Sequence, residues 1–199
     1  MKKPIQVGIT GGIGSGKSLI CRIFTSLGIA AYDADSRAKR LMTTDRILVD
    51  QIKKEFGNLS HHRDGSLNKE HLRQAFSDPL RVKKLNELVH PRVGVDYEKW
   101  VTQQSGDKYV IKEAALLIES GSAGKLDHLI VVHAPKSIRI QRVLKRDPQR
   151  TLAEVEHIME NQMDEEEMMK EADSVILNDE SRLVIPQVLE LHERFNSMN

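Results

Sequence analysis

Cysteine, aromatic side chains and net charge are all scarce in this sequence of 199 residues. The single cysteine, Cys21, cannot form a disulfide within the chain, so we expect a small buried thiol and a reducing compartment. Aromatic residues make up 4% of the chain, too few for a platform on which nucleic-acid bases stack. The 30 Lys and Arg nearly balance the 29 Asp and Glu, and a net charge of +1 provides no field to hold a nucleic acid or an anionic membrane. We therefore expect no nucleic-acid partner and no membrane partner.

Long hydrophobic runs are missing as well. A membrane-spanning helix needs about 20 apolar residues, and no stretch of this chain approaches that length. The first residues, "MKK", have the charge of a signal peptide, but the apolar run after them is short and breaks into glycines. Hydrophobic residues still make up 39% of the chain, which is enough for a proper core. The composition predicts a cytoplasmic protein with one folded domain, and it leaves the oligomeric state open.

The most informative stretch is "GITGGIGSGKS", residues 8–18, which holds five glycines. Gly11, Gly16, Lys17 and Ser18 match G-x-x-x-x-G-K-[ST], the pattern of the loop that wraps the phosphates of ATP or GTP. Glycines let successive backbone N–H groups converge on a phosphate, and the N-terminus of the following helix favours an anion. Lys17 can then reach the β- and γ-phosphates, while Ser18 offers its hydroxyl to Mg²⁺. The alternative is a glycine-rich turn that matches by chance.

Five apolar runs predict strands, and helical patterns separate them. The runs are residues 4–10, 28–33, 109–114, 128–133 and 174–177. Strands that alternate with helices form a parallel sheet covered on both faces, with ligands at the carboxyl ends of the strands. We expect an α/β fold, a three-layer α/β/α P-loop NTPase fold with a five-stranded parallel sheet, a helical acceptor-binding insertion and a helical lid.

Two helical excursions interrupt the series of strands. The first follows the second strand and contains the helical patterns "RAKRLM", "RILVDQIKKEF", "KEHLRQAF" and "PLRVKKLNELVH", too much chain for one crossover. The second follows the fourth strand and is broken at Asp147-Pro148. We therefore predict a single domain over residues 1–199. Its predicted parts are a core (1–34, 109–135 and 173–199), a helical acceptor subdomain (35–108) and a lid (136–172).

Carboxylates follow two of the predicted strands. Asp33 ends the second strand, where a carboxylate can accept the proton of an attacking hydroxyl and help to orient Mg²⁺ or its waters. Asp35, two residues on, is expected mainly to cap the following helix, although a contact with the metal stays open. Glu113 ends the third strand and resembles the acidic end of a Walker B strand. A metal role, an acceptor role and a purely structural role all stay open for Glu113.

Charge is polarised in the second excursion. Residues 136–150 carry six cations and one anion, and residues 154–171 carry eight anions and one cation. Arg139, Arg142 and Arg146 are spaced at i, i+3 and i+7, which places them on one helix face. Arginines of a lid are suited to neutralising charge on a transferring phosphoryl group. The alternative is a solvated face that pairs with the acidic stretch.

With these residues in view, the sequence resembles the dephospho-CoA kinase family over essentially its whole length. "GITGGIGSGKS" is similar to the family's N-terminal motif, and "DAD" at 33–35 to the acidic motif that closes its second strand. Residues 64–93 are similar to its acceptor region, which ends in the pair His90-Pro91. "RVLKRD", "ENQM" and "ADSVILN" resemble its lid and final strand.

The resemblance implies an activity, substrates and site residues. The activity is transfer of the γ-phosphate of ATP, with Mg²⁺, to the 3′-hydroxyl of dephospho-CoA, the final step of coenzyme A synthesis. The implied catalytic residues are Asp33 as base, Lys17 and Arg142. The implied ATP contacts are Gly11, Gly12, Ile13, Gly14, Ser15, Gly16, Lys17, Ser18, Arg142, Arg146 and Asn178. The implied acceptor contacts are Asp33, His90, Glu113 and Leu117, and the implied metal contacts are Ser18 and Asp33.

Some positions depart from the family's pattern. Asn68-Lys69 stands where the family commonly has Asp-Arg, and "EAALLIE" has Glu113 for Asp and Ala115 for Pro. These departures leave the acceptor roles of Lys69 and Glu113 open. Without the family, His90 is interpreted as a helix-end histidine stabilised by the helix dipole.

Two other functions compete with this interpretation. A GTPase-type switch would need Asn-Lys-x-Asp and Asp-x-x-Gly, and the sequence contains neither. A P-loop kinase of another small hydroxyl or nucleoside substrate is the nearer alternative, because the residues alone predict only an ATP-dependent kinase of a small hydroxyl compound.

Overall fold

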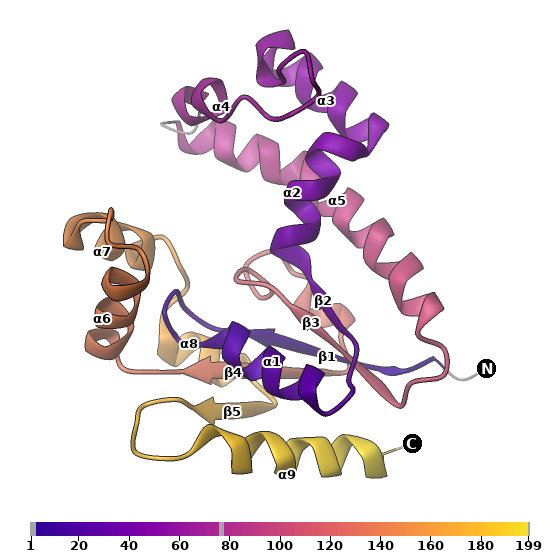
Figure 1. Ribbon diagram of the computed structural model, residues 1–199, viewed down its shortest axis with the longest axis vertical. Helices are drawn as coiled ribbons and strands as arrows, with labels where there is room; N and C mark the ends of the chain where they lie inside the picture. Colours follow the sequence, from indigo (N-terminus) through magenta and orange to yellow (C-terminus); the bar gives the residue numbers. More distant parts are fainter. Residues whose placement is uncertain (1–2, 76–77, 199) are drawn as a thin grey trace. The chain divides into compact units, whose positions relative to one another are not determined.

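Five parallel strands form one sheet in the order β2-β3-β1-β4-β5 (Figure 1). In the computed structural model, which describes residues 3–75 and 78–198, the strands are β1 (Ile5–Thr10), β2 (Ala31–Asp33), β3 (Tyr109–Glu113), β4 (His128–His133) and β5 (Ser174–Leu177). All four neighbouring pairs are parallel. The predicted α/β fold with a five-stranded parallel sheet is confirmed.

The second strand is shorter than its apolar run. Gly28 has a φ of +85° and donates its N–H to the carbonyl of Thr25, so it ends the preceding helix instead of starting a strand. Pairing with β3 begins at Ala31, which is opposite Ile111, and ends with Asp33 opposite Glu113. The carboxylates that end these two strands therefore belong to neighbouring backbone positions at the carboxyl ends of the strands.

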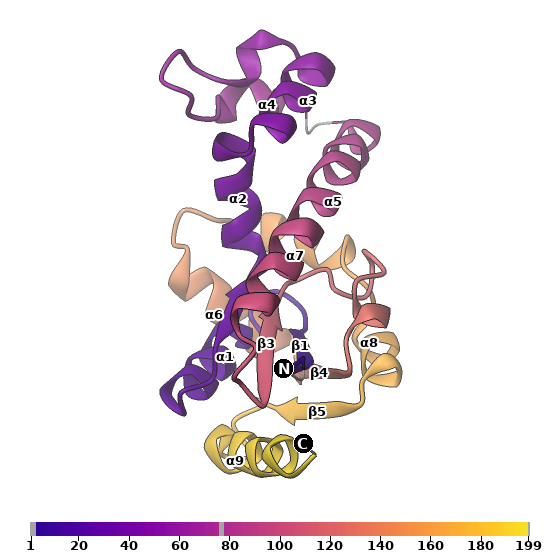
Figure 2. The ribbon, with the colours of Figure 1, turned by 90° about the vertical axis from the view of Figure 1, so that its right-hand side faces the viewer.

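Helices cover both faces of the sheet. Helix α1 (Lys17–Ser26) and helix α9 (Val184–Ser197) pack against each other on one face, and α8 (Glu165–Glu171) packs against β4. Figure 2 shows α1 and α8 on opposite sides of the strands. Buried apolar side chains from β1, β3, β4, β5, α1 and α9 form the core: Val7, Ile9, Ile20, Cys21, Phe24, Tyr109, Ile111, Ile130, Val132, Ile176, Val188 and Phe195. The apolar sheet is thus the middle of three layers. Cys21 is buried in this core, which confirms the prediction for its side chain.

The second excursion forms α6 (Lys136–Arg146), α7 (Leu152–Glu160) and α8. Helix α6 ends just before Asp147-Pro148, as predicted, because proline disfavours a helical conformation in the residue before it. Thr151 then starts α7 with a reciprocal capping box that includes Glu154. A further break between α7 and α8, where the side chain of Asp164 caps α8, was absent from the prediction.

The contacts divide the chain into two compact units, one of residues 1–33 and 103–199 and one of residues 34–102. The second unit contains α2 (Ala34–Thr44), α3 (Arg46–Phe56), α4 (Lys69–Ala75) and most of α5 (Pro79–Gln103). The predicted helical segments of the first excursion are therefore helices, except that Phe76 lies outside the described residues. The roles predicted for the core, the acceptor subdomain and the lid stay predictions.

The interpretation of His90 as a helix-end residue is wrong. Helix α5 is 25 residues long and extends well past His90, with Pro91 in its interior. A proline at this position removes one backbone hydrogen bond, but the helix continues because Val89, Val93, Tyr97 and Val101 are buried along one side. None of the described helices, α5 included, is long and apolar enough to cross a membrane.

An ion pair in the second unit joins the N-cap residue of α3 to α5. Asp45 caps α3 by accepting the N–H of Leu48 at 3.1 Å, and it also accepts from Nε and Nη2 of Arg92 on α5 at 2.9 and 2.6 Å. The two side chains are 12% and 24% exposed. Burial alone would raise the pKa of Asp45, but the hydrogen bonds from Arg92 and Leu48 outweigh it, so the pKa lies below its usual value.

Asp45→Asn tests the pair. Asparagine keeps the helix cap but loses the charge that Arg92 binds, so we expect a loss of about 2 kcal/mol in the free energy of unfolding, the usual worth of a hydrogen bond to a charged group. A depressed pKa stabilises the fold above the unfolded value near 4 and loses that effect as the pH falls below it. The loss in Asp45→Asn should therefore be full at pH 7 and shrink in denaturant melts below about pH 4. Asp50→Asn, on the exposed side of α3, is the control; equal losses in both variants at pH 7 would contradict the account.

Candidate active site

The loop between β1 and α1 packs too closely against its neighbours to tolerate side chains at several positions. Gly11, Gly14 and Gly16 have φ values of +145°, +80° and +101°, which other residues rarely adopt. A Cβ at Gly11 would meet the carbonyl oxygen of Val132, and one at Gly16 would meet Nδ2 of Asn178. The glycine pattern is therefore required by this loop, which leads directly into the N-terminus of α1, a favourable place for an anion.

Lys17 folds back over the loop. Its Nζ donates to the carbonyl oxygens of Gly11 at 2.7 Å and Gly12 at 3.2 Å. An ammonium that binds loop carbonyls in this way is held beside the same backbone that would surround a phosphate. It can exchange those neutral acceptors for the charged oxygens of a phosphate, which form stronger hydrogen bonds.

Ser18, Asp33 and Glu113 lie at the carboxyl ends of the strands, where the sheet meets the loop. Ser18 Oγ donates to Oε1 of Glu113 at 2.9 Å. Asp33 is exposed and is the register partner of Glu113 in the neighbouring strand. Beneath them, burial first and then the charge of Glu113 raise the pKa of the Cys21 thiol, which therefore stays protonated. One hydroxyl from the first turn of α1 and the two carboxylates that end β2 and β3 thus occur where the strands end.

Asp35 does not cap the helix that follows β2. Helix α2 begins at Ala34, directly after the strand, so Asp35 is in its first turn, where a carboxylate still interacts favourably with the helix dipole. The prediction placed the helix start two residues too late because no loop separates this strand from this helix.

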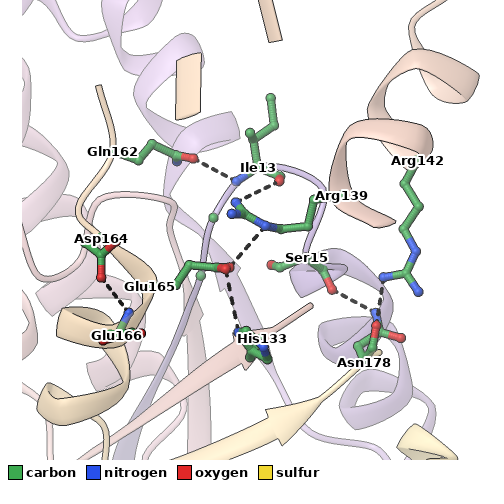
Figure 3. Close-up of polar contacts among 12 residues, drawn as sticks. Ile13, Ser15, His133, Arg139, Arg142, Gln162, Asp164, Glu165, Glu166 and Asn178 are labelled. Carbon is green, nitrogen blue, oxygen red and sulfur yellow. Dashed lines mark hydrogen bonds and ion pairs between the residues drawn. The ribbon is translucent and has the colours of Figure 1, made fainter. Parts of the chain in front are cut away.

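Two residues of the second excursion, Gln162 and Arg139, bind the loop at Ile13, and a third, Glu165, pairs with Arg139. Oε1 of Gln162 accepts the N–H of Ile13 at 2.8 Å, and Nη1 of Arg139 donates to the Ile13 carbonyl at 3.5 Å (Figure 3). Nε of Arg139 lies 3.1 Å from Oε1 of Glu165. Gln162 and Glu165 were missed as site residues, although Gln162 is part of "ENQM". The sequence of an acidic helical stretch does not indicate which groups its side-chain oxygens bind.

The arginines of α6 differ in their surroundings. Arg139 pairs with Glu165 of the acidic stretch, but it is 6% exposed and therefore does not lie on a solvated face; a contact of Arg139 with phosphate stays a prediction. Arg142 donates from Nη1 to the backbone carbonyl of Asn178 at 3.0 Å, and its Nη2 lies 3.4 Å from Glu180. Arg146 binds Asp147 through two hydrogen bonds, which hold the pKa of Asp147 below its usual value. Arg142 and Arg146 thus bind acceptors near the surface.

Asn178 follows β5 and supports the loop from below. Its Nδ2 donates to the carbonyl oxygen of Ser15 at 2.8 Å, and its backbone carbonyl accepts from Arg142 (Figure 3). Asn178 therefore connects the loop, the final strand and α6. The structure places its side chain on the loop backbone.

The implied acceptor residues are in different places. Leu117 is 1% exposed and its Cδ1 faces Gly8, so its side chain belongs to the packing over β1. His90 is on the exposed side of α5, in the unit of residues 34–102.

The positions that depart from the family's pattern have local contacts. Asn68 caps α4 by accepting the N–H of His71, and Lys69 begins that helix. Ala115 accepts a hydrogen bond from Thr10 through its carbonyl. The acceptor roles stay predictions.

The oxygen donors at the sheet edge fit a magnesium ion. Mg²⁺ prefers hard oxygen ligands and keeps waters and phosphate oxygens beside one or two protein groups. Ser18 Oγ and the neighbouring carboxylates are donors of this kind. Within residues 3–75 and 78–198 no cluster of three His, Cys, Asp or Glu is suited to a metal, so a dedicated protein cage is not found there.

Sequence comparisons point to one family. The family model for dephospho-CoA kinase matches residues 5–183. A dephospho-CoA kinase of Bacteroides fragilis is 36% identical over 194 residues, covering 94% of this chain and 91% of that protein.

Solved structures give the same picture for the fold. A protein of Thermus thermophilus has a TM-score of 0.85 and 33% identity, with 97% of this chain and 98% of that chain covered. The dephospho-CoA kinase of Campylobacter jejuni has a TM-score of 0.72 and 24% identity, with 98% of each chain covered.

Asn178→Asp tests the support beneath the loop. Aspartate keeps the size of the side chain but replaces the donor that faces the Ser15 carbonyl by a second acceptor, so the two oxygens repel each other and the loop must shift. We expect ATP affinity, measured by calorimetry, to fall about tenfold or more, which corresponds to about 1.4 kcal/mol. Asn58→Asp, at an exposed position far along the chain, makes the same change and is the control. An unchanged affinity in Asn178→Asp would show that the loop does not depend on Asn178.

Proposed function

The chain belongs to the dephospho-CoA kinase family, and we propose which of its residues carry out the family's reaction. The chain is a kinase that phosphorylates dephospho-CoA with ATP to give coenzyme A and ADP. We propose the 3′-hydroxyl of the acceptor ribose as the attacking group. The observation that carries the assignment of residues is the convergence of the glycine loop, Ser18, Asp33 and Glu113 at the carboxyl edge of the sheet.

The loop of residues 11–18 binds the triphosphate. Its backbone N–H groups and the N-terminus of α1 provide donors to the β-phosphate. Nζ of Lys17 leaves the carbonyls of Gly11 and Gly12 and moves onto the β- and γ-phosphates, where two charged partners replace two neutral ones. Asn178 holds the loop from the end of β5 while this exchange occurs.

Asp33 is the base. As the acceptor oxygen attacks the γ-phosphorus in line with the leaving ADP oxygen, the hydroxyl proton passes to the carboxylate of Asp33. Asp33 is suited to this step because it ends β2 at the sheet edge and is exposed, so a hydroxyl substrate can reach it. His90, Glu113 and Leu117 remain the proposed contacts of the acceptor, with residues 35–108 as its subdomain.

The Mg²⁺ that accompanies ATP is proposed at Ser18 and Asp33. When bound, it neutralises charge on the β- and γ-phosphate oxygens. Glu113 accepts a hydrogen bond from the Ser18 hydroxyl, so it orients the Ser18 oxygen with its lone pairs available to a cation.

The single cysteine, with no disulfide possible within the chain, supports a cytoplasmic location.

Asp33→Asn tests both the assignment and the reaction. Asparagine preserves the size of the side chain but has no basic oxygen, so kcat for coenzyme A formation from ATP and dephospho-CoA should fall about 10²- to 10⁴-fold, the usual worth of a positioned base, with ATP binding nearly intact. Asp35→Asn, two residues away, is the matched control and should retain most of the rate. Both rates are followed by ADP release and by chromatography of the product. If Asp35→Asn is the slower variant, Asp35 is the base. If wild-type protein phosphorylates another hydroxyl compound and not dephospho-CoA, the acceptor assignment is wrong.

Arg142→Ala tests the lid of residues 136–172. An arginine that contacts the phosphates only after closure stabilises the transition state more than the ground state. We expect kcat to fall about 10²-fold, equal to about 2.7 kcal/mol of barrier, while the dissociation constant of ATP changes much less. Lys145→Ala, an exposed cation on the same helix, controls for loss of charge. A loss of ATP affinity in proportion to the loss of rate would mean that Arg142 binds ATP in the ground state and that closure has no part in its effect.

A further inference from the structure

The backbone of Ile13, at the tip of the phosphate loop, is held from two sides. Its N–H donates to Oε1 of Gln162 at 2.8 Å, and its carbonyl accepts from Nη1 of Arg139 at 3.5 Å. Figure 3 shows Gln162 approaching from the α7–α8 junction, while the side chain of Arg139 extends beneath the loop toward Glu165. The peptide groups of the loop must point in fixed directions to receive phosphate oxygens, and these two side chains fix one of its residues.

Arg139 can occupy this place only because two loop residues lack side chains. A Cβ at Gly12 would meet Nη1 of Arg139, and a Cβ at Gly14 would lie 2.6 Å from the backbone carbonyl oxygen of Arg139. Helix α6 and the loop are therefore in direct contact at the level of the backbone. A shift of Arg139 would require the loop to shift with it.

Glu165 holds Arg139 in position. Oε1 of Glu165 lies 3.1 Å from Nε of Arg139, whose side chain is 7% exposed, and Oε2 lies 3.7 Å from Nδ1 of His133. A buried guanidinium that loses its carboxylate is left with an uncompensated charge, which is strongly destabilising. Arg139 without Glu165 would therefore move toward water and away from Ile13.

From these contacts we infer that Gln162, Arg139 and Glu165 form a clamp on Ile13 and act as positioning residues for phosphoryl transfer. The inference rests on the proposed binding of ATP at the loop. Gln162 sets the direction of the Ile13 N–H, Arg139 sets that of its carbonyl, and Glu165 acts through Arg139. The clamp joins the loop to α6 and to the α7–α8 junction, so the geometry of the loop depends on residues more than 120 positions away in the sequence.

Neutral substitutions separate positioning from stability. Glu165→Gln leaves Arg139 buried without its counter-charge, so we expect both a lower melting temperature and a tenfold or greater loss of kcat/KM for ATP. KM for dephospho-CoA should not change. Glu166→Gln, the exposed neighbour on α8, makes the same change of charge and should match wild type.

The double variant Arg139→Gln with Glu165→Gln decides between the two roles. Removing both charges avoids the unpaired buried guanidinium, so the melting temperature should recover toward that of wild type. The glutamine that replaces Arg139 is too short to reach the Ile13 carbonyl, so kcat/KM for ATP should stay low. If the rate recovers together with the melting temperature, Arg139 and Glu165 are only a structural pair and the inference is overturned.

Gln162→Leu tests the other side of the clamp. It removes the acceptor of the Ile13 N–H without disturbing a buried charge, so we expect a tenfold or greater loss of kcat/KM for ATP with a normal melting temperature. Glu160→Ala, an exposed change on the same segment, is the control. A Gln162→Leu enzyme with wild-type constants would overturn the inference.

A binding measurement separates failure of the clamp from failure of the proposed ATP site. Wild-type protein and Lys17→Ala are titrated with ATP by calorimetry. If Lys17→Ala binds ATP as wild type does, ATP does not bind at this loop, and both the site and the clamp are overturned. If Lys17→Ala loses affinity while Glu165→Gln and Gln162→Leu match their controls in kcat/KM, the clamp alone is overturned.

Discussion

The close packing of the phosphate loop against its surroundings is the constraint on which the rest of the site depends. Val132, Arg139 and Asn178 occupy the space in which side chains of the loop would lie. Such packing excludes side chains at Gly11, Gly12 and Gly16, so the loop offers bare backbone to a ligand at these positions. It also means that β4, α6 and the end of β5 together determine where that backbone lies.

A second consequence of this packing is that the site is assembled from distant parts of the chain. Glu113 approaches Ser18 from β3, and Asn178 approaches Ser15 from the end of β5. Each contact is made at the carboxyl end of a strand, because a parallel sheet brings these ends to one edge. The chemistry is thus divided between a rigid loop, which binds phosphate, and the carboxylates of the neighbouring strands.

Much of the fold could be predicted from local patterns. The apolar runs at 128–133 and 174–177 are strands with the predicted bounds, because a buried parallel strand is apolar on both faces and therefore conspicuous. The order of the strands was not predicted, because hydrophobic periodicity does not show which strands are neighbours. Helix α5 continued past Pro91 against the local signal, since burial of Val93, Tyr97 and Val101 compensates for one lost hydrogen bond.

The candidate site was predictable where a residue's role follows from the backbone it belongs to. Lys17 and Ser18 are placed by the loop itself, and Asp33 by the end of a strand. Gln162, Glu165 and the burial of Arg139 were not predictable, because their roles depend on how α6 and α8 pack against the loop. Spacing along one helix places Arg139 and Arg142 on the same face, yet only tertiary packing decides that Arg139 is enclosed while Arg142 remains accessible.

The break between α7 and α8 lets one loop residue receive contacts from two places in the α6–α8 segment. Arg139 in α6 and Gln162 in the α7–α8 junction both bind Ile13, so the chain between them leaves Ile13 and returns to it. These two contacts close residues 139–162 into a loop that contains α7. The entropy cost of closing a stretch of chain grows with its length. Once one contact has formed, the second therefore closes only the short stretch between Arg139 and Gln162, and each contact lowers the cost of forming the other.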